Sequence, residues 1–152
     1  MSAAEYITRS ADETISLGRE LASRLKDLRM VILHGDLGAG KTTLVKGIAE
    51  GLKAASQDDV TSPTFTLIHE YRGLDVTLYH VDLYRIDTQR ELETLGLDEL
   101  LAEDRNLVLI EWGEKFPRLT TECDAVIRIE RAGETKRKVR LTSRTNNVGQ
   151  FA

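Results

Sequence analysis

The sequence contains GDLGAGKT at residues 35–42, which matches the P-loop pattern G-x-x-x-x-G-K-[ST]. In such a loop the glycines let the backbone wrap a polyphosphate with its N–H groups pointing inward. The helix that follows directs its N-terminus, with unpaired N–H groups and a positive dipole end, at the same phosphates. Lys41 can neutralise the β- and γ-phosphates, and the Thr42 hydroxyl can bind Mg²⁺. This stretch therefore predicts a site for a nucleoside polyphosphate and Mg²⁺.

The neighbouring segments supply the strand and the helix that a P-loop requires. Residues 30–33 form a short, continuous apolar run, which is typical of a buried strand. Residues 41–52 predict a helix, with one apolar side formed by Leu44, Val45, Ile48 and Leu52. Upstream, residues 12–26 also repeat with a helical period, and Ser10 is a suitable N-cap for them.

Further strands are predicted downstream of the P-loop helix. Residues 64–71 and 75–81 alternate in polarity and flank a turn, which indicates a β-hairpin. Residues 125–131 and 136–142 do the same around a glycine, which indicates a second hairpin. Residues 107–110 form a second buried apolar run. The sheet should therefore contain both parallel and antiparallel strands.

The remaining helical signal is residues 89–103, read as one or two helices broken at Gly96. Together these segments predict an α/β fold. The sequence has no internal repeat and no linker-like stretch, and its length suits one domain. We expect a single domain over residues 1–152, with room for a flexible tail at about 143–152.

Two carboxylates are candidates for the chemistry beside the phosphates. Glu111 directly follows the apolar run at 107–110, and P-loop enzymes need an acidic residue at the end of a neighbouring buried strand. It could hold Mg²⁺ directly or through water, or be a surface glutamate. Asp82, in His80-Val81-Asp82-Leu83-Tyr84-Arg85, could orient water or touch Mg²⁺, or serve only as a turn residue.

Composition excludes several classes of protein. The single cysteine, Cys123, permits no intrachain disulfide and is expected to pack in the core, and the three histidines show no zinc-ligand spacing. No apolar run approaches the ~20 residues of a membrane-spanning helix, and no signal peptide is visible. We therefore expect a cytoplasmic protein without a membrane partner.

The charge is uneven along the chain. Its formal net charge is -4, which argues against a surface that grips DNA or RNA throughout. Residues 128–144 nevertheless carry seven basic and only two acidic side chains. This segment is either a polar binding face or a solvated surface. We expect no DNA partner.

Five motifs occur together and in order. They are GDLGAGKTT at 35–43, SPTFTL at 62–67, HVDLYR at 80–85, ELETLGLDE at 91–99 and IEWGEKF at 110–116. This set resembles the bacterial TsaE (YjeE) family, the ATPases of tRNA threonylcarbamoyladenosine biosynthesis. The resemblance runs in register from about residue 10 to 116 and more loosely to about 142.

The resemblance implies a P-loop NTPase-type three-layer fold and Mg²⁺-dependent hydrolysis of ATP to ADP. It also implies the partner proteins TsaD and TsaB, with tRNA reached only through their complex, in modification of adenosine 37 of tRNAs that read A-starting codons. Carried over, Lys41, Asp82 and Glu111 are catalytic, Thr42 and Glu111 bind Mg²⁺, and Trp112 completes a functional Glu-Trp pair. The implied nucleotide contacts are Gly35, Asp36, Leu37, Gly38, Ala39, Gly40, Lys41, Thr42 and Thr43, together with Ser10 and Ala11 at the first helix.

Other classes remain open at this point. A small GTPase would need an Asn-Lys-x-Asp motif and a switch Asp-x-x-Gly, and neither occurs. A small-molecule kinase of the P-loop type would need a second substrate pocket, for which 152 residues leave little room. A nucleotide-gated adaptor would bind ATP without significant turnover. Since slow, partner-dependent hydrolysis would resemble the adaptor, only a turnover assay separates them.

Overall fold

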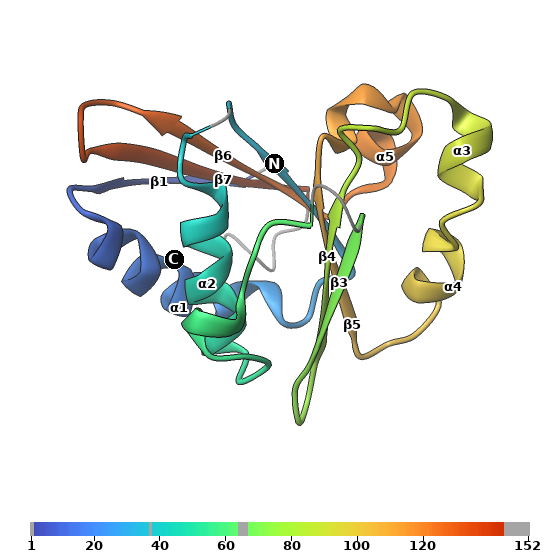
Figure 1. The fold of residues 1–152 in the computed structure, drawn as a ribbon, viewed down its shortest axis with the longest axis horizontal. Helices are drawn as coiled ribbons and strands as arrows, with labels where there is room; N and C mark the ends of the chain where they lie inside the picture. The colour runs from blue at the N-terminus through green and yellow to red at the C-terminus, as the bar shows by residue number, and fades with distance from the viewer. Residues whose placement is uncertain (1, 37, 64–66, 145–152) are drawn as a thin grey trace.

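The fold is built on one mixed sheet of seven strands in the order β1-β7-β6-β2-β5-β4-β3 (Figure 1). The computed structural model describes residues 2–36, 38–63 and 67–144. The strands are β1 (Ser2–Thr8), β2 (Met30–His34), β3 (Ile68–Arg72), β4 (Thr77–Asp82), β5 (Asn106–Glu111), β6 (Ala125–Arg131) and β7 (Arg137–Ser143).

The middle of the sheet is parallel and its edges are antiparallel. β2 runs parallel to β5 and to β6, and β4 runs parallel to β5. The hairpins β3–β4 and β6–β7 and the pair β1–β7 are antiparallel. The predicted mixture of strand directions is thus confirmed. Since carboxyl ends of parallel strands share one edge of a sheet, the ends of β2, β4 and β5 lie together.

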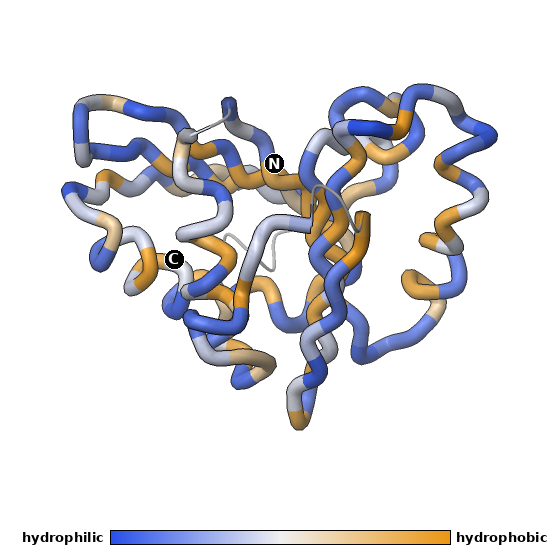
Figure 2. The backbone as a smooth tube through the Cα atoms, in the orientation of Figure 1, coloured by the Kyte–Doolittle hydropathy of each residue, from blue (hydrophilic) through white to orange (hydrophobic). Residues whose placement is uncertain are grey.

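Helices cover both faces of the sheet, which makes three layers (Figure 1). They are α1 (Ala11–Leu25), α2 (Lys41–Gly51), α3 (Gln89–Glu93), α4 (Leu97–Leu101) and α5 (Pro117–Glu122), with short 3-10 helices η1 (Gln57–Asp59) and η2 (Gly113–Lys115). The sheet has a hydrophobic core on each face, and alternate residues of β2 belong to different cores. Val31 and Leu33 pack with α1 and α2, whereas Met30 and Ile32 pack on the opposite face. The strands in the middle of the molecule are accordingly mostly hydrophobic (Figure 2).

The contact between α1 and α2 is unusually close. A Cβ at Gly47 would lie 2.0 Å from the Ile15 carbonyl oxygen, and one at Gly18 would lie 2.5 Å from the Leu44 carbonyl oxygen. Only glycine permits this approach at both positions. Because α2 begins at the end of the P-loop, α1 helps to fix the helix whose N-terminus faces the loop.

One strand, one α-helix and both 3-10 helices were not predicted from the sequence. β1 escaped notice because its residues are only half-buried or exposed, apart from Thr8 at its end, so no apolar face marks it. α5 is a short helix of six residues that begins at Pro117, too brief for a helical period to show. The predicted strand at 64–71 is observed from Ile68, and residues 64–66 lie outside the described part of the chain.

The predicted break at Gly96 is confirmed, because Gly96 has a φ of 73° between α3 and α4. Cys123 is buried, as expected. β7 extends to Ser143, and all but the first two residues of the predicted tail lie outside the described residues. Among the helices that the structure describes, none is long and apolar enough to cross a membrane.

Candidate nucleotide-binding site

The P-loop connects the end of β2 to the first residue of α2, as the motif requires. Gly38 and Gly40 have φ angles of 79° and 102°, in the left-handed region where a side chain would be strained. Lys41 follows as the first residue of α2. Leu37, which was also expected to contact phosphates, lies outside the described residues. The glycines therefore occupy the positions where the loop bends sharply.

Lys41 and Glu111 meet beside the loop. Lys41 is 7% and Glu111 4% exposed, and Lys41 Nζ lies 3.4 Å from Glu111 Oε1. Glu111 is the last residue of β5, level with Leu33 on the adjacent β2, so the parallel pairing brings it to the P-loop. Burial of both charges is tolerable because they are paired.

His80 is the second partner of Glu111. Its Nε2 lies 2.5 Å from Glu111 Oε2, and its side chain is fully buried. Within the described part of the chain, His80 Nδ1 has no hydrogen-bond partner. Burial acts to raise the pKa of Glu111, but the hydrogen bond from His80 and the charges of His80 and Lys41 outweigh it and hold that pKa below its ordinary value. Glu111 is thus a buried, ionised carboxylate and not a solvent-exposed glutamate.

Asp82 lies next to Glu111, because β4 and β5 pair in register at their last residues. It is 3% exposed, and its Oδ1 accepts the backbone N–H of Tyr84 at 2.9 Å. This contact fits the turn role that the sequence analysis gave as one alternative for Asp82. The position beside Glu111 is equally compatible with a role at the phosphates.

Lys41, Asp82 and Glu111 line one cavity of about 510 Å³. Its walls are Gly38, Gly40, Lys41, Thr42, Thr43, Ser62, Asp82, Tyr84, Glu111, Trp112 and Arg137. The structure therefore brings the three predicted catalytic residues and both predicted Mg²⁺ ligands together.

A smaller cavity of about 150 Å³ adjoins the first. It is lined by Ser10, Ala11, Thr14, Gly40, Thr43, Glu134, Thr135 and Arg137. Gly40, Thr43 and Arg137 belong to both cavities. Ser10 and Ala11 thus reach the P-loop region, at the start of α1, and the pair of cavities offers length for a nucleotide beyond its phosphates.

The oxygen donors suit Mg²⁺ held mainly by a nucleotide. In the described ranges, no group of three or more His, Cys, Asp or Glu side chains could hold a metal ion by itself. Mg²⁺ in P-loop proteins takes one or two protein oxygens and completes its shell with phosphate oxygens and water. Thr42 and Glu111 line the same cavity and supply such oxygens.

Trp112, Tyr84 and Arg137 line the larger cavity and were not predicted as site residues from their patterns alone. Trp112, whose backbone φ is 64°, lies with its ring centroid 5.1 Å from Lys41 Nζ. Its ring also packs against that of Tyr84, at 5.1 Å between centroids. Arg137 comes from the basic segment 128–144. Adjacency to Glu111 was the only sequence signal for Trp112, and nothing in the pattern singled out Arg137 among seven basic residues.

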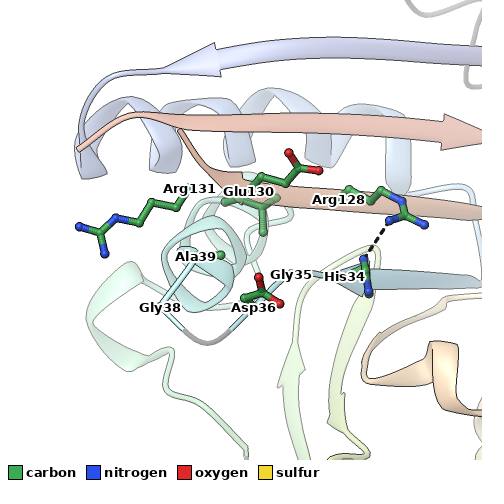
Figure 3. A pocket seen from close by; sticks show the side chains of 9 residues that line it. His34, Gly35, Asp36, Gly38, Ala39, Arg128, Glu130 and Arg131 are labelled. Carbon is green, nitrogen blue, oxygen red and sulfur yellow. Dashed lines mark hydrogen bonds between the residues drawn. The ribbon is translucent and has the colours of Figure 1, made fainter. Parts of the chain in front are cut away.

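A third cavity of about 460 Å³ lies between the P-loop and β6 (Figure 3). Gly35, Asp36 and Ala39 line this cavity and not the two described above. Arg128 Nη1 lies 3.3 Å from His34 Nδ1, the contact drawn in Figure 3. The charged side chains from β6 point to different ends of the cavity and do not converge (Figure 3). The predicted phosphate contacts are therefore divided between two sides of the loop.

Comparison with known proteins gives consistent results. The chain matches the family model described as threonylcarbamoyl adenosine biosynthesis protein TsaE over residues 8–139. It is 39% identical over 137 residues to the tRNA threonylcarbamoyladenosine biosynthesis protein TsaE of Aquifex aeolicus, covering 90% of this chain and 94% of that protein. It is 38% identical over 143 residues to the corresponding protein of Bacillus subtilis, covering 94% and 87%.

The fold is also similar to a solved structure. The crystal structure of Bacillus subtilis YdiB superposes with a TM-score of 0.76 at 33% sequence identity, covering 99% of this chain and 91% of that chain. The three-layer P-loop fold that the motifs implied is thus confirmed. With the family model matching most of the chain, this protein belongs to the TsaE family of tRNA threonylcarbamoyladenosine biosynthesis proteins.

Proposed function

We propose that this chain is a Mg²⁺-dependent ATPase that drives tRNA threonylcarbamoyladenosine formation by resetting a complex of TsaB and TsaD. The observation that carries the proposal is the meeting of Lys41, Asp82 and Glu111 in one cavity beside the P-loop. A cation for phosphate charge and two carboxylates at adjacent strand ends are the groups that phosphoryl transfer requires. Membership of the family supplies the pathway.

The pairing of Lys41 with Glu111 suggests how the site receives a nucleotide. Lys41 Nζ, 3.4 Å from Glu111 Oε1, can exchange that carboxylate for β- and γ-phosphate oxygens. Glu111 Oε1 would then be available as a ligand for Mg²⁺, while Oε2 keeps its hydrogen bond from His80. Bound Mg²⁺ would neutralise charge on the phosphate oxygens. The ion pair thus keeps both groups compensated until the phosphates replace it.

Asp82 is assigned to the hydrolysis step. It is buried at the edge of the same cavity, next to Glu111 in the sheet. A carboxylate here can orient the attacking water, and Thr42 can supply the second protein oxygen for Mg²⁺. Both residues already line the cavity in which these roles would be carried out.

The partners are proposed because the three cavities described above all border the P-loop, so none of them is a separate site for the acceptor adenosine. The net charge of -4 argues against tRNA binding by this chain alone, since phosphate neutralisation dominates that affinity. ATP can reset a partner only if the two nucleotide states of this chain bind it with different affinity. We therefore assign the acceptor adenosine to the TsaB–TsaD complex.

Reconstitution tests the proposal. The purified chain, TsaB, TsaD, Mg-ATP, threonylcarbamoyl-adenylate and tRNA are combined, and modified tRNA is counted over many turnovers. We expect sustained turnover with this chain and a stop after about one turnover without it, or with Lys41→Ala in its place. If multiple-turnover modification is unchanged without this chain, or with Lys41→Ala in its place, the pathway role is wrong. The prediction that the chain binds ATP would not be affected.

A further inference from the structure

Arg137 joins the P-loop to a distant part of the chain. It is the first residue of β7, and its Nε donates to the Ala39 carbonyl oxygen at 2.8 Å. Its Nη1 donates to the carbonyl oxygens of Lys136 at 3.0 Å and Gly133 at 3.3 Å. One guanidinium therefore holds the β6–β7 turn and the P-loop at the same time.

The bond to Ala39 controls a donor of the phosphate-binding loop. The peptide between Ala39 and Gly40 is planar and trans, so its C=O and its N–H point in opposite directions. Fixing the Ala39 carbonyl therefore fixes the direction of the Gly40 N–H, one of the loop's backbone donors. Gly40 has a φ of 102°, and because glycine is conformationally permissive, an external contact on its peptide helps to hold one orientation.

Arg137 also lies where the two cavities of the site meet. Gly40, Thr43 and Arg137 line both of them, and the turn residues Glu134 and Thr135 line the smaller one. Tying the turn to the P-loop therefore sets the distance between the phosphate end of the site and its far wall.

We propose that Arg137 is a positioning residue that preorganises the P-loop for phosphate, by anchoring the Ala39 carbonyl to the β6–β7 turn. This inference rests on the proposed nucleotide binding. Arginine suits the task because its planar fork carries separate N–H groups that reach two segments at once. Lysine keeps the charge but offers a single nitrogen, so it cannot hold both carbonyl groups in the same way.

The test compares Arg137→Ala and Arg137→Lys with the parent and with Arg140→Ala. Arg140 lies exposed on the same strand, so its removal changes the charge equally without touching the P-loop. Affinity for Mg-ATP and for Mg-tripolyphosphate is measured by calorimetry. We expect both Arg137 variants to lose roughly tenfold or more for both probes, since bonds from a charged donor are among the stronger ones. Arg140→Ala should bind as the parent does.

Hydrogen exchange supplies a readout that a general loss of stability would not move. With tripolyphosphate bound, the Gly40 amide should exchange faster in Arg137→Ala than in the parent, while amides in the middle of β2 and β5 keep their protection. In the parent, tripolyphosphate should slow exchange at Gly40. If Arg137→Ala does not fold, this slowing in the parent and the Arg137→Lys affinities decide the matter.

The positioning role and the proposed function fail in different ways. If the parent binds ATP and Arg137→Ala binds it equally, or if Arg137→Lys restores full affinity, the positioning role is wrong and the proposed ATPase stands. If the parent shows no slowing at Gly40 with tripolyphosphate bound, the positioning role is wrong as well. A parent that binds neither ATP nor tripolyphosphate would overturn the proposed function and this inference together.

Discussion

At the scale of single residues, Glu111 is held between Lys41 and His80 and is only 4% exposed. Lys41 reaches one carboxylate oxygen and His80 the other. The sequence predicted that Glu111 would follow a buried strand beside the P-loop, and the structure confirms that place. It did not predict the contact with His80. The two residues are 31 positions apart on different strands, and no pattern in the sequence shows that these strands pair.

Removing the cation should weaken nucleotide binding. In Lys41→Ala the β- and γ-phosphates lose their nearest fixed positive charge, so we expect affinity for Mg-ATP to fall at least tenfold. Calorimetry on a variant with parent-like circular dichroism measures this. Lys46→Ala, on the same helix but outside the cavities described above, is the matched control and should bind normally. Parent-like affinity of Lys41→Ala would contradict the assignment.

The depressed pKa of Glu111 makes stability depend on pH. An unfolded glutamate titrates near about 4.3, and the folded value is lower. The stabilisation is therefore complete above the unfolded value and is lost as pH falls through the folded one. We expect Glu111→Gln to unfold at lower urea than the parent at pH 6, with the gap narrowing below about pH 4. If the difference in urea midpoint between the parent and Glu111→Gln stays constant between pH 6 and 3.5, the titration of Glu111 does not contribute to stability.

At the scale of elements, periodicity identified the strands and helices that bury a large apolar surface. β2, β5, α1 and α2 carry apolar residues at most inward positions, so their types were predicted within one or two residues of their bounds. β1 and α5 were missed because β1 has little buried surface and α5 is short. The two hairpin pairings, β3 with β4 and β6 with β7, were predicted and are confirmed. The pairing of β6 with β2 was not predicted, because it joins strands that lie far apart in the sequence.

The close contact of α1 with α2 gives a test at this scale. In Gly47→Ala the new methyl group meets the Ile15 backbone oxygen, which cannot rotate away. Overpacking of this kind costs about 1–3 kcal/mol, and this exceeds the roughly 1 kcal/mol that alanine gains over glycine inside a helix. We expect a lower free energy of unfolding and weaker ATP binding, measured by urea titration and calorimetry. Glu20→Ala, exposed on α1, should change neither, and equal stability of Gly47→Ala would refute the packing argument.

At the scale of the whole molecule, charge is separated over the fold. The basic segment 128–144 lies mainly on the β6–β7 hairpin, whereas the acidic residues within 91–104 lie on and around α3 and α4, at the opposite, right-hand side of the molecule (Figure 1). The P-loop cavity lies between them, where the ends of β2, β4 and β5 meet. A change at the phosphates therefore has two chemically distinct surfaces through which it could reach a partner.

Release of inorganic phosphate from ATP tests the central claim most directly. It is measured for the chain alone, with TsaB and TsaD, with Mg²⁺ and with the chelator EDTA, and for Asp82→Asn. We predict slow Mg²⁺-dependent release alone, faster release with the partners, and loss of release in Asp82→Asn with ATP binding retained. Binding of ATP without phosphate release under every condition would contradict the account and identify a nucleotide-gated adaptor instead.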